Sequence, residues 1–240
     1  MTEFLSSFLS DMAMKVMPTL PGEAWQTIYA AVGATVFAYV IGMPVGIILV
    51  TGEKGGIRPL PGVLMKVLNF IVNTLRSIPF LILMIMALPL SMIVFGTTIG
   101  TIASLIPLVI AAFPFVARMV ESSLREVDKG VIEAAQAMGC SPWQIVKKVM
   151  LPECRPSLIS GATIALTTIL AYGAMAGAIG GGGLGKVAID YGYYRTKPDV
   201  MYICVILLII LVQVFQSVGT WLAVRLDKRI TSNKNKKGRL

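Results

Sequence analysis

The chain alternates between long apolar stretches and shorter polar or charged segments. A helix that crosses about 30 Å of hydrocarbon needs about 20 mostly apolar residues, and every backbone polar group inside the hydrocarbon must be paired within the protein. Five stretches meet this length: 27–51, 67–95, 96–116, 158–179 and 200–223. The pattern therefore predicts an all-α membrane protein with five transmembrane helices.

The boundary between the second and third stretches is the least marked. No charged residue separates them, whereas Pro89, Gly96 and Gly100 favour a turn. We therefore expect the chain to reverse direction within a few residues of position 96.

The positive charges indicate how the spans are oriented. Only 14% of the residues are charged, against about 25% in soluble domains. All but four of the 21 lysines and arginines fall on one side of the predicted spans, the exceptions being Lys15, Lys186, Arg195 and Lys197. Cytoplasmic segments carry the excess of Lys and Arg, so the N-terminus is predicted outside and the C-terminus inside. The net charge of +9 thus reports topology rather than a nucleic-acid surface.

The two ends of the chain differ from the transmembrane domain, residues 27–223. In segment 1–26, apolar positions repeat at helical spacing and predict a helix on the extracytoplasmic face of the membrane that the chain spans. These positions are Phe4, Leu5, Phe8, Leu9, Met12 and Val16. Asp11 and Lys15 interrupt this run, which argues against a signal peptide. The basic cytoplasmic tail, 224–240, is expected to be disordered from residue 231 and attracted to anionic lipid.

The chemistry-bearing residue types are sparse. The chain has three cysteines and no histidine. The odd number, with Cys140 and Cys154 in predicted cytoplasmic segments, argues against a disulfide scaffold. Without histidine there is no imidazole metal site and no Ser-His or Cys-His pair, and no carboxylate lies inside a predicted span. We therefore expect no catalysis and no cofactor within this chain, and a function that depends on conformational change.

The polar segment between the third and fourth spans, residues 133–152, has the pattern of two short helices joined by a turn. Residues 133–138 are rich in helix formers, and Gly139 supplies the permissive backbone of a helix C-terminus. On residue types alone, two interpretations remain open. The segment is either a solvated loop or a docking element, in which Ala134 and Ala135 let a partner groove approach closely.

The second helix of the 133–152 segment has its own start and stop signals. Ser141 and Gln144 have the spacing of a capping box, and Pro142 suits a first helical turn. Leu151 precedes Pro152 and is expected to end this helix, because the residue before a proline avoids the helical region. One apolar stripe is expected on it: Ile145, Val149 and Met150.

The 133–152 segment resembles the coupling loop of the permeases of binding-protein-dependent ABC importers. The matching residues are Glu133, Ala134, Ala135, Gly139, Val149, Leu151 and Pro152, with Val149 at a position where that family usually has isoleucine. Residues 40–46, 73–80, 112–121 and 177–185 extend the likeness to the methionine-uptake type of the family. The resemblance favours the docking interpretation, with Met138 on the same surface.

The resemblance implies a function and a set of partners. It implies the type I permease fold of a transmembrane subunit that imports methionine, both enantiomers and close derivatives, by alternating access. It also implies a second copy of the chain, two cytoplasmic ATPase subunits that bind ATP and Mg²⁺, and an extracytoplasmic methionine-binding protein. Alternatives are a permease for another small amino acid or solute, a channel that conducts without ATP, and a membrane anchor for a cytoplasmic complex.

The glycine-rich stretch 180–186 resembles a nucleotide-binding loop only superficially. Val187 stands where a phosphate loop has a Ser or Thr for Mg²⁺, and no predicted strand precedes the stretch. Close helix packing or a flexible outer gate is the better interpretation.

Candidate gate or pathway residues are Arg76, Ser77, Pro79, Gly181 and Gly182. For Arg76 the alternatives are snorkelling to the cytoplasmic interface or a salt bridge between subunits.

Three charged residues at the end of the third span, Arg118, Glu121 and Arg125, are expected to form a solvated row of ion pairs. Glu133 is expected to contact a basic residue of an ATPase subunit. The 14 methionines and the prolines within the spans do not distinguish pore lining from lipid contact.

Overall fold

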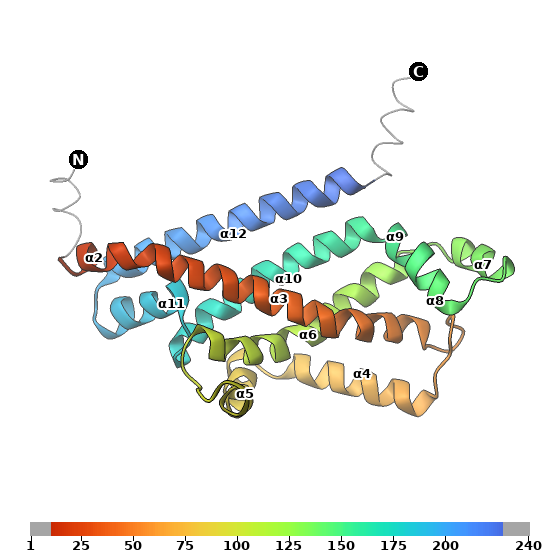
Figure 1. Cartoon of the computed structure of the whole chain (residues 1–240), viewed down its shortest axis with the longest axis horizontal. Coiled ribbons are helices and arrows are strands. Elements are labelled where there is room, and N and C mark those ends of the chain that lie inside the picture. Colours follow the sequence, from red (N-terminus) through yellow and green to blue (C-terminus); the bar gives the residue numbers. More distant parts are fainter. Residues whose placement is uncertain (1–10, 228–240) are drawn as a thin grey trace, which may run out of the picture. The chain divides into compact units, whose positions relative to one another are not determined.

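The structure is a computed structural model that describes residues 11–227. Within this range the chain is helical and has no β-strand, as predicted (Figure 1). The elements are α2 (Asp11–Val16), η1 (Met17–Thr19), α3 (Leu20–Thr51), α4 (Gly62–Ser77), α5 (Phe80–Phe95), α6 (Thr101–Arg125), α7 (Lys129–Ala137), α8 (Pro142–Ile145), η2 (Val146–Met150), α9 (Leu151–Glu153), α10 (Arg155–Ala176), η3 (Gly177–Ile179), α11 (Gly183–Val187), η4 (Ala188–Tyr194) and α12 (Pro198–Leu226).

Four helical stretches of the described chain are long and apolar enough to cross a membrane: Ala13–Thr51, Thr101–Arg125, Arg155–Ile179 and Pro198–Leu226. The pair α4 and α5 gives a fifth if it is counted as one broken span. This agrees with five spans, while the predicted orientation, N-out and C-in, stays a prediction.

The second predicted span, 67–95, is not one continuous helix. It is broken at Ile78 and Pro79, where Pro79 has an extended backbone with φ −54° and ψ 132°. Proline has no N–H to donate, and it disfavours the helical region for the residue before it. The expectation of one helix was therefore wrong, and two helices of 16 residues each take its place.

The turn after α5 lies where it was expected, but the next helix begins later. Gly96 ends α5 in the left-handed region with φ 70°, and Gly100 has φ 101°. Helix α6 then runs from Thr101 to Arg125. The predicted third span, 96–116, was therefore too early at both ends, because the loop continues to the second glycine and the helix extends through its charged C-terminal turns.

The described residues divide into two compact units, each with its own packing. Within the described range, unit 1 comprises residues 11–37, Ile78–Ala112 and Leu166–Phe215; unit 2 comprises Ala38–Ser77, Phe113–Ala165 and residues 216–227. The boundaries between them fall within α3, α6, α10 and α12 and at the break between α4 and α5.

In unit 1, the start of the described chain packs into a protein core. The buried residues of this core come from α2, α3, α11, η4 and α12: Ala13, Val16, Leu20, Leu184, Val187, Ala188, Val200 and Cys204. Helix α3 begins at Leu20, seven residues before the predicted span. Of the apolar set predicted for a surface helix, Val16 packs into this core, and the surface location of the segment stays a prediction. Residues 1–10 and the tail 228–240 lie outside the described residues.

In unit 2, two glycines let α3 approach α6 closely. A Cβ built on Gly42 would lie 2.8 Å from the Phe113 carbonyl oxygen, and one on Gly46 would lie 2.6 Å from that of Ala117. Their spacing, Gly-x-x-x-Gly, is the small-residue pattern of helix contacts in membranes. Sequence reasoning noticed this stretch only as part of a family resemblance and missed its packing role.

Candidate functional site

The first helix of the 133–152 segment is closed at both ends by local hydrogen bonds. The Asp128 side chain accepts from the Gly130 N–H at 2.7 Å and caps α7. At the other end Gly139 has φ 78°, its N–H donates to the Gln136 carbonyl at 2.9 Å, and the Cys140 N–H donates to the Ala135 carbonyl at 3.1 Å. This pair of bonds is a Schellman motif, so the role predicted for Gly139 is confirmed.

The second helix starts with the predicted capping box. The Gln144 N–H donates to Ser141 Oγ at 3.4 Å, and the Ser141 N–H donates to Gln144 Oε1 at 2.8 Å. Pro142 occupies the first turn. The turn between α7 and α8 is therefore fixed by the backbone and side chains of the segment itself.

The predicted stop at Leu151 and Pro152 was wrong. Leu151 is helical, with φ −62° and ψ −42°, and the helix continues through Pro152 to Glu153. The preceding turn, Val146–Met150, is a π-helix, in which the Leu151 N–H donates to the Val146 carbonyl. Proline clashes with the carbonyl four residues earlier in a regular α-helix, and we infer that the wider π turn makes room for its ring.

One face of the 133–152 segment is buried in unit 2. Ala135, Ile145, Val146 and Met150 are each less than 5% exposed. The predicted stripe was therefore nearly right, but Val149 is only half-buried and Val146 belongs to the buried face. In Figure 1, α7 and α8 lie beside each other at one end of this unit.

The opposite face of the 133–152 segment is open to solvent. Met138 is 76% exposed and Trp143 is 67% exposed. Glu133, Ala134 and Gly139 are exposed, whereas Leu151 and Pro152 are half-buried. Trp143 was missed by sequence reasoning, although an aromatic residue beside a helix cap in a polar segment was a usable signal. Exposed apolar side chains grouped on one face are typical of interaction sites.

A network of charged and amide side chains joins the end of α6 to α4 and to the α3–α4 loop. Arg118 donates to Glu121 at 2.5 Å and to the side-chain oxygens of Asn69 and Asn73 at 2.8 Å each. Arg125 donates to Glu121 at 2.9 Å and forms a further ion pair with Glu53 of the loop.

This network corrects the expectation of a solvated row of ion pairs. Glu121 is only 8% exposed, because two arginines cover its carboxylate. Arg125 and Glu53 also line a cavity of about 440 Å³ together with Lys129, Glu133 and Gln136. The network and the 133–152 segment therefore line the same cavity.

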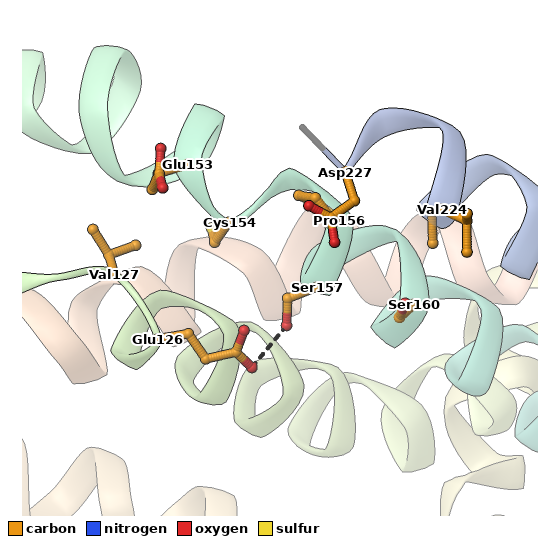
Figure 2. A pocket seen from close by; sticks show the side chains of 10 residues that line it. Glu126, Val127, Glu153, Cys154, Pro156, Ser157, Ser160, Val224 and Asp227 are labelled. Carbon is orange, nitrogen blue, oxygen red and sulfur yellow. Dashed lines mark hydrogen bonds between the residues drawn. The ribbon is translucent and has the colours of Figure 1, made fainter. Parts of the chain in front are cut away.

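A second cavity, of about 310 Å³, lies at the junction of α9 and α10 and has an acidic lining (Figure 2). Across it, Ser157 Oγ donates to Glu126 Oε1 at 2.9 Å, and it lies 3.0 Å from Ser123 Oγ. This contact fixes the start of α10 to the end of α6. Cys154 lines the same cavity, and burial raises the pKa of its thiol to about 11. Among residues 11–227 no group of His, Cys, Asp and Glu side chains is placed to hold a metal ion.

The remaining sequence candidates lie in two places. Arg76 and Ser77 form the exposed last turn of α4, in unit 2. Pro79 begins α5, and Gly181 and Gly182 join η3 to α11, all in unit 1.

The glycine-rich turn in unit 1 is tightly packed. A Cβ on Gly181 would lie 2.7 Å from the Ala176 carbonyl oxygen, and one on Gly182 would overlap Thr101. The Gly183 N–H donates to the Glu23 carboxylate at 3.0 Å, so this backbone donor is already used within the protein. Of the two interpretations of these glycines, close packing has the support of these contacts.

The sequence and the fold are similar to those of known transport proteins. The model of a family described as "binding-protein-dependent transport system inner membrane component" matches residues 42–232. The probable D-methionine transport system permease protein MetI of Vibrio cholerae is 48% identical over 206 residues, which cover 85% of this chain and 91% of that protein. The methionine import system permease protein MetP of Bacillus subtilis is 45% identical over 164 residues, covering 68% of this chain and 74% of the relative.

Among solved structures, a chain of the inward-facing MetNI methionine ABC transporter superimposes with a TM-score of 0.87. It is 40% identical in sequence, and the match covers 92% of this chain and 100% of that one. A chain of an amino acid ABC transporter reaches a TM-score of 0.73 at 17% identity, which shows the fold alone.

Proposed function

We propose a transport function for this chain because it belongs to the family of binding-protein-dependent transport system inner membrane components. It is therefore a multi-pass membrane protein with the permease fold of an ABC importer. The function proposed is import of methionine, both the D- and the L-form, and of close derivatives. The observation that carries this proposal is the identity of 48% to a D-methionine permease over nearly its whole length.

The 133–152 segment is the proposed coupling site for a cytoplasmic ATPase subunit. Its exposed face offers Met138, Gly139 and Trp143 to a partner groove, and Glu133 is available at the rim. Its caps and its buried face hold it rigid, as a lever must be if it is to transmit motion. ATP and Mg²⁺ belong to the ATPase in this proposal, and this chain carries no cofactor.

The proposed assembly contains two copies of this chain, two ATPase subunits and an outer methionine-binding protein. Alternating access follows if ATP binding favours one conformation of the pair over the other, because a ligand shifts an equilibrium only through its unequal affinity for the two states. Spans of both copies would then line the path.

The test of the coupling site is Gly139→Trp, with Gly96→Trp as its matched control. Both glycines have a positive φ, 78° and 70°, and a Cβ at either position meets no atom within 4 Å. Each change therefore imposes the same left-handed strain of about 1–2 kcal/mol, but only Gly139 lies on the proposed docking face. Gly139→Trp should abolish co-purification of the ATPase and uptake of radiolabelled methionine, while Gly96→Trp retains both.

Normal uptake by Gly139→Trp would disprove docking at this surface. Flux through the isolated chain in liposomes without ATP would instead indicate a channel. Competition by unlabelled amino acids against labelled methionine distinguishes the proposed substrate from other small amino acids. If deleting the gene for this chain leaves the uptake of every amino acid unchanged, a membrane anchor would be favoured instead.

A further inference from the structure

Helix α4 carries a polar stripe within a broken membrane span. The stripe consists of Lys66, Asn69, Asn73, Arg76 and Ser77, and their spacing of three or four residues places them on one side of the helix. A polar face on a membrane helix turns toward protein or water rather than lipid. Asn69 and Asn73 of this stripe meet Arg118 of α6, whereas Arg76 and Ser77 are exposed.

Arg76 lies deep along this stripe. It is ten residues beyond Lys66, or about 15 Å along the helix axis at about 1.5 Å per residue. If Lys66 marks the cytoplasmic interface, Arg76 lies near the middle of a hydrocarbon core of about 30 Å. A charge at that depth is costly and is usually functional.

The charge of Arg76 is not balanced within the described chain. Arg76 takes no part in the ion pairs that Arg118 and Arg125 form in the described chain, and it is exposed. It stands in the last turn of α4, where the terminal carbonyl groups compensate only part of a positive charge. Within the described chain, the Arg76 guanidinium is therefore free to bind an anion.

The neighbours of Arg76 complete a site for an amino-acid zwitterion. Asn73, one turn earlier, uses its side-chain oxygen to accept from Arg118 at 2.8 Å, which leaves its amide N–H groups as donors. Ser77 Oγ donates to the Asn73 backbone carbonyl at 2.9 Å and keeps its lone pairs as acceptors. Donors for a carboxylate and acceptors for an ammonium group thus lie within one turn.

The large apolar hollow of unit 1 offers no comparable site. It measures about 590 Å³ and is lined by α10, α11, η4 and α12, with Gln213 as the most polar side chain and no charged residue. A zwitterion placed there would lose its hydration without compensation. The comparison favours the end of α4 as the place where a charged substrate is held.

We propose that Arg76 and Asn73 bind the α-carboxylate of the transported amino acid, while Ser77 and the last carbonyls of α4 accept its ammonium group. Arginine pairs with carboxylates through two parallel hydrogen bonds, which suits a transient subsite along the path. This inference rests on the proposed import of methionine.

The test measures protection of a cysteine beside the site in the complete transporter. Thr74→Cys is introduced where the three native cysteines are replaced, and Leu64→Cys, exposed on the apolar side of α4, is the control. Millimolar methionine should slow modification of Thr74→Cys by a charged methanethiosulfonate reagent and leave Leu64→Cys unchanged. Methioninol, which lacks the carboxylate, should give no protection.

Adding Arg76→Gln should weaken protection by methionine about tenfold or more, the effect expected for loss of a hydrogen bond to a charged group, and Arg76→Lys should restore part of it. The proposal is overturned if methionine protects the Arg76→Gln variant as well as the protein that keeps Arg76, or if methioninol protects equally well. It is also overturned if methionine gives no protection in the protein that keeps Arg76. Dissociation of the two copies in Arg76→Gln without any effect on protection overturns it too, and indicates a salt bridge between subunits. Uptake of labelled methionine is measured in parallel: if uptake is present but protection is absent, only the subsite fails, whereas absence of uptake refutes the proposed function itself.

Discussion

Neutralising Glu121 should destabilise the protein more than neutralising any exposed acid of the same network. The Glu121 carboxylate is 10% exposed and lies against Arg118 at 2.5 Å and Arg125 at 2.9 Å. Glu121→Gln keeps the shape of the side chain and one hydrogen-bond acceptor but removes the negative charge. Two arginines then face each other across a neutral amide.

The expected cost follows from the remaining contacts. Removing one partner of a buried ion pair costs about 3–5 kcal/mol. Here the arginines keep other acceptors, since Arg118 still reaches Asn69 and Asn73 and Arg125 still reaches Glu53, and Arg125 is 46% exposed. We therefore expect a smaller loss of about 1–3 kcal/mol, the cost of leaving a buried polar group unsatisfied.

The measurement is thermal unfolding of the purified protein in detergent. A chain of 150–250 residues loses about 2–4 °C in Tm per kcal/mol, so Glu121→Gln should lower Tm by about 2–12 °C. Glu53→Gln is the matched control, because Glu53 and Arg125 are 44% and 46% exposed and such a pair contributes about 0–1 kcal/mol. Equal shifts in the two variants, or a Glu121→Gln effect that vanishes in high salt, would refute the argument from burial.

Three further predictions test other contacts. Cys140, which is half-buried, should react with an impermeant maleimide from the cytoplasmic side. Cys154 should not react, because it is 4% exposed and its raised pKa of about 11 leaves little thiolate at neutral pH. Labelling of Cys140 from outside would contradict the predicted orientation. Tyr39→Phe should leave Tm unchanged or raise it, because the Tyr39 hydroxyl is buried and has no hydrogen-bond partner in the described chain; a clear drop would reveal a partner. Gly46→Ala should lower Tm because its Cβ meets backbone at 2.6 Å, while Gly22→Ala, with open space, should not; equal effects would count against close packing.

Features set by neighbouring residues were predictable from the sequence. The capping box of Ser141 and Gln144 and the positive φ of Gly139 depend on a few adjacent positions, and they were predicted correctly. The apolar length of the spans is likewise a local property. The break at Pro79 was within reach of the same rules, which favour an extended residue before proline.

Features set by distant residues were not predictable in this way. The burial of Glu121 depends on Arg118, which is itself held by two asparagines 45 and 49 residues away in the chain. The π turn before Pro152 overrides the local stop signal, and Ile145 and Met150 beside it are buried. Neither the burial of Glu121 nor the π turn could be predicted from the spacing of residues in the sequence.

The contacts of unit 2 indicate how a force on the 133–152 segment would spread. The Ser157–Glu126 bond joins the start of α10 to the end of α6, and Asp128 caps α7 through the Gly130 N–H, so the connection from α6 through the segment to α10 has little internal freedom. A displacement imposed by a docked ATPase would therefore move the end of α6 as well. Because Arg118 of α6 holds the asparagines of α4, that displacement would be carried to the helix that presents Arg76. The proposed coupling site and the proposed substrate subsite are thus linked through α6 and the Arg118 hydrogen bonds to α4, a route that does not include the exposed Arg125–Glu53 ion pair.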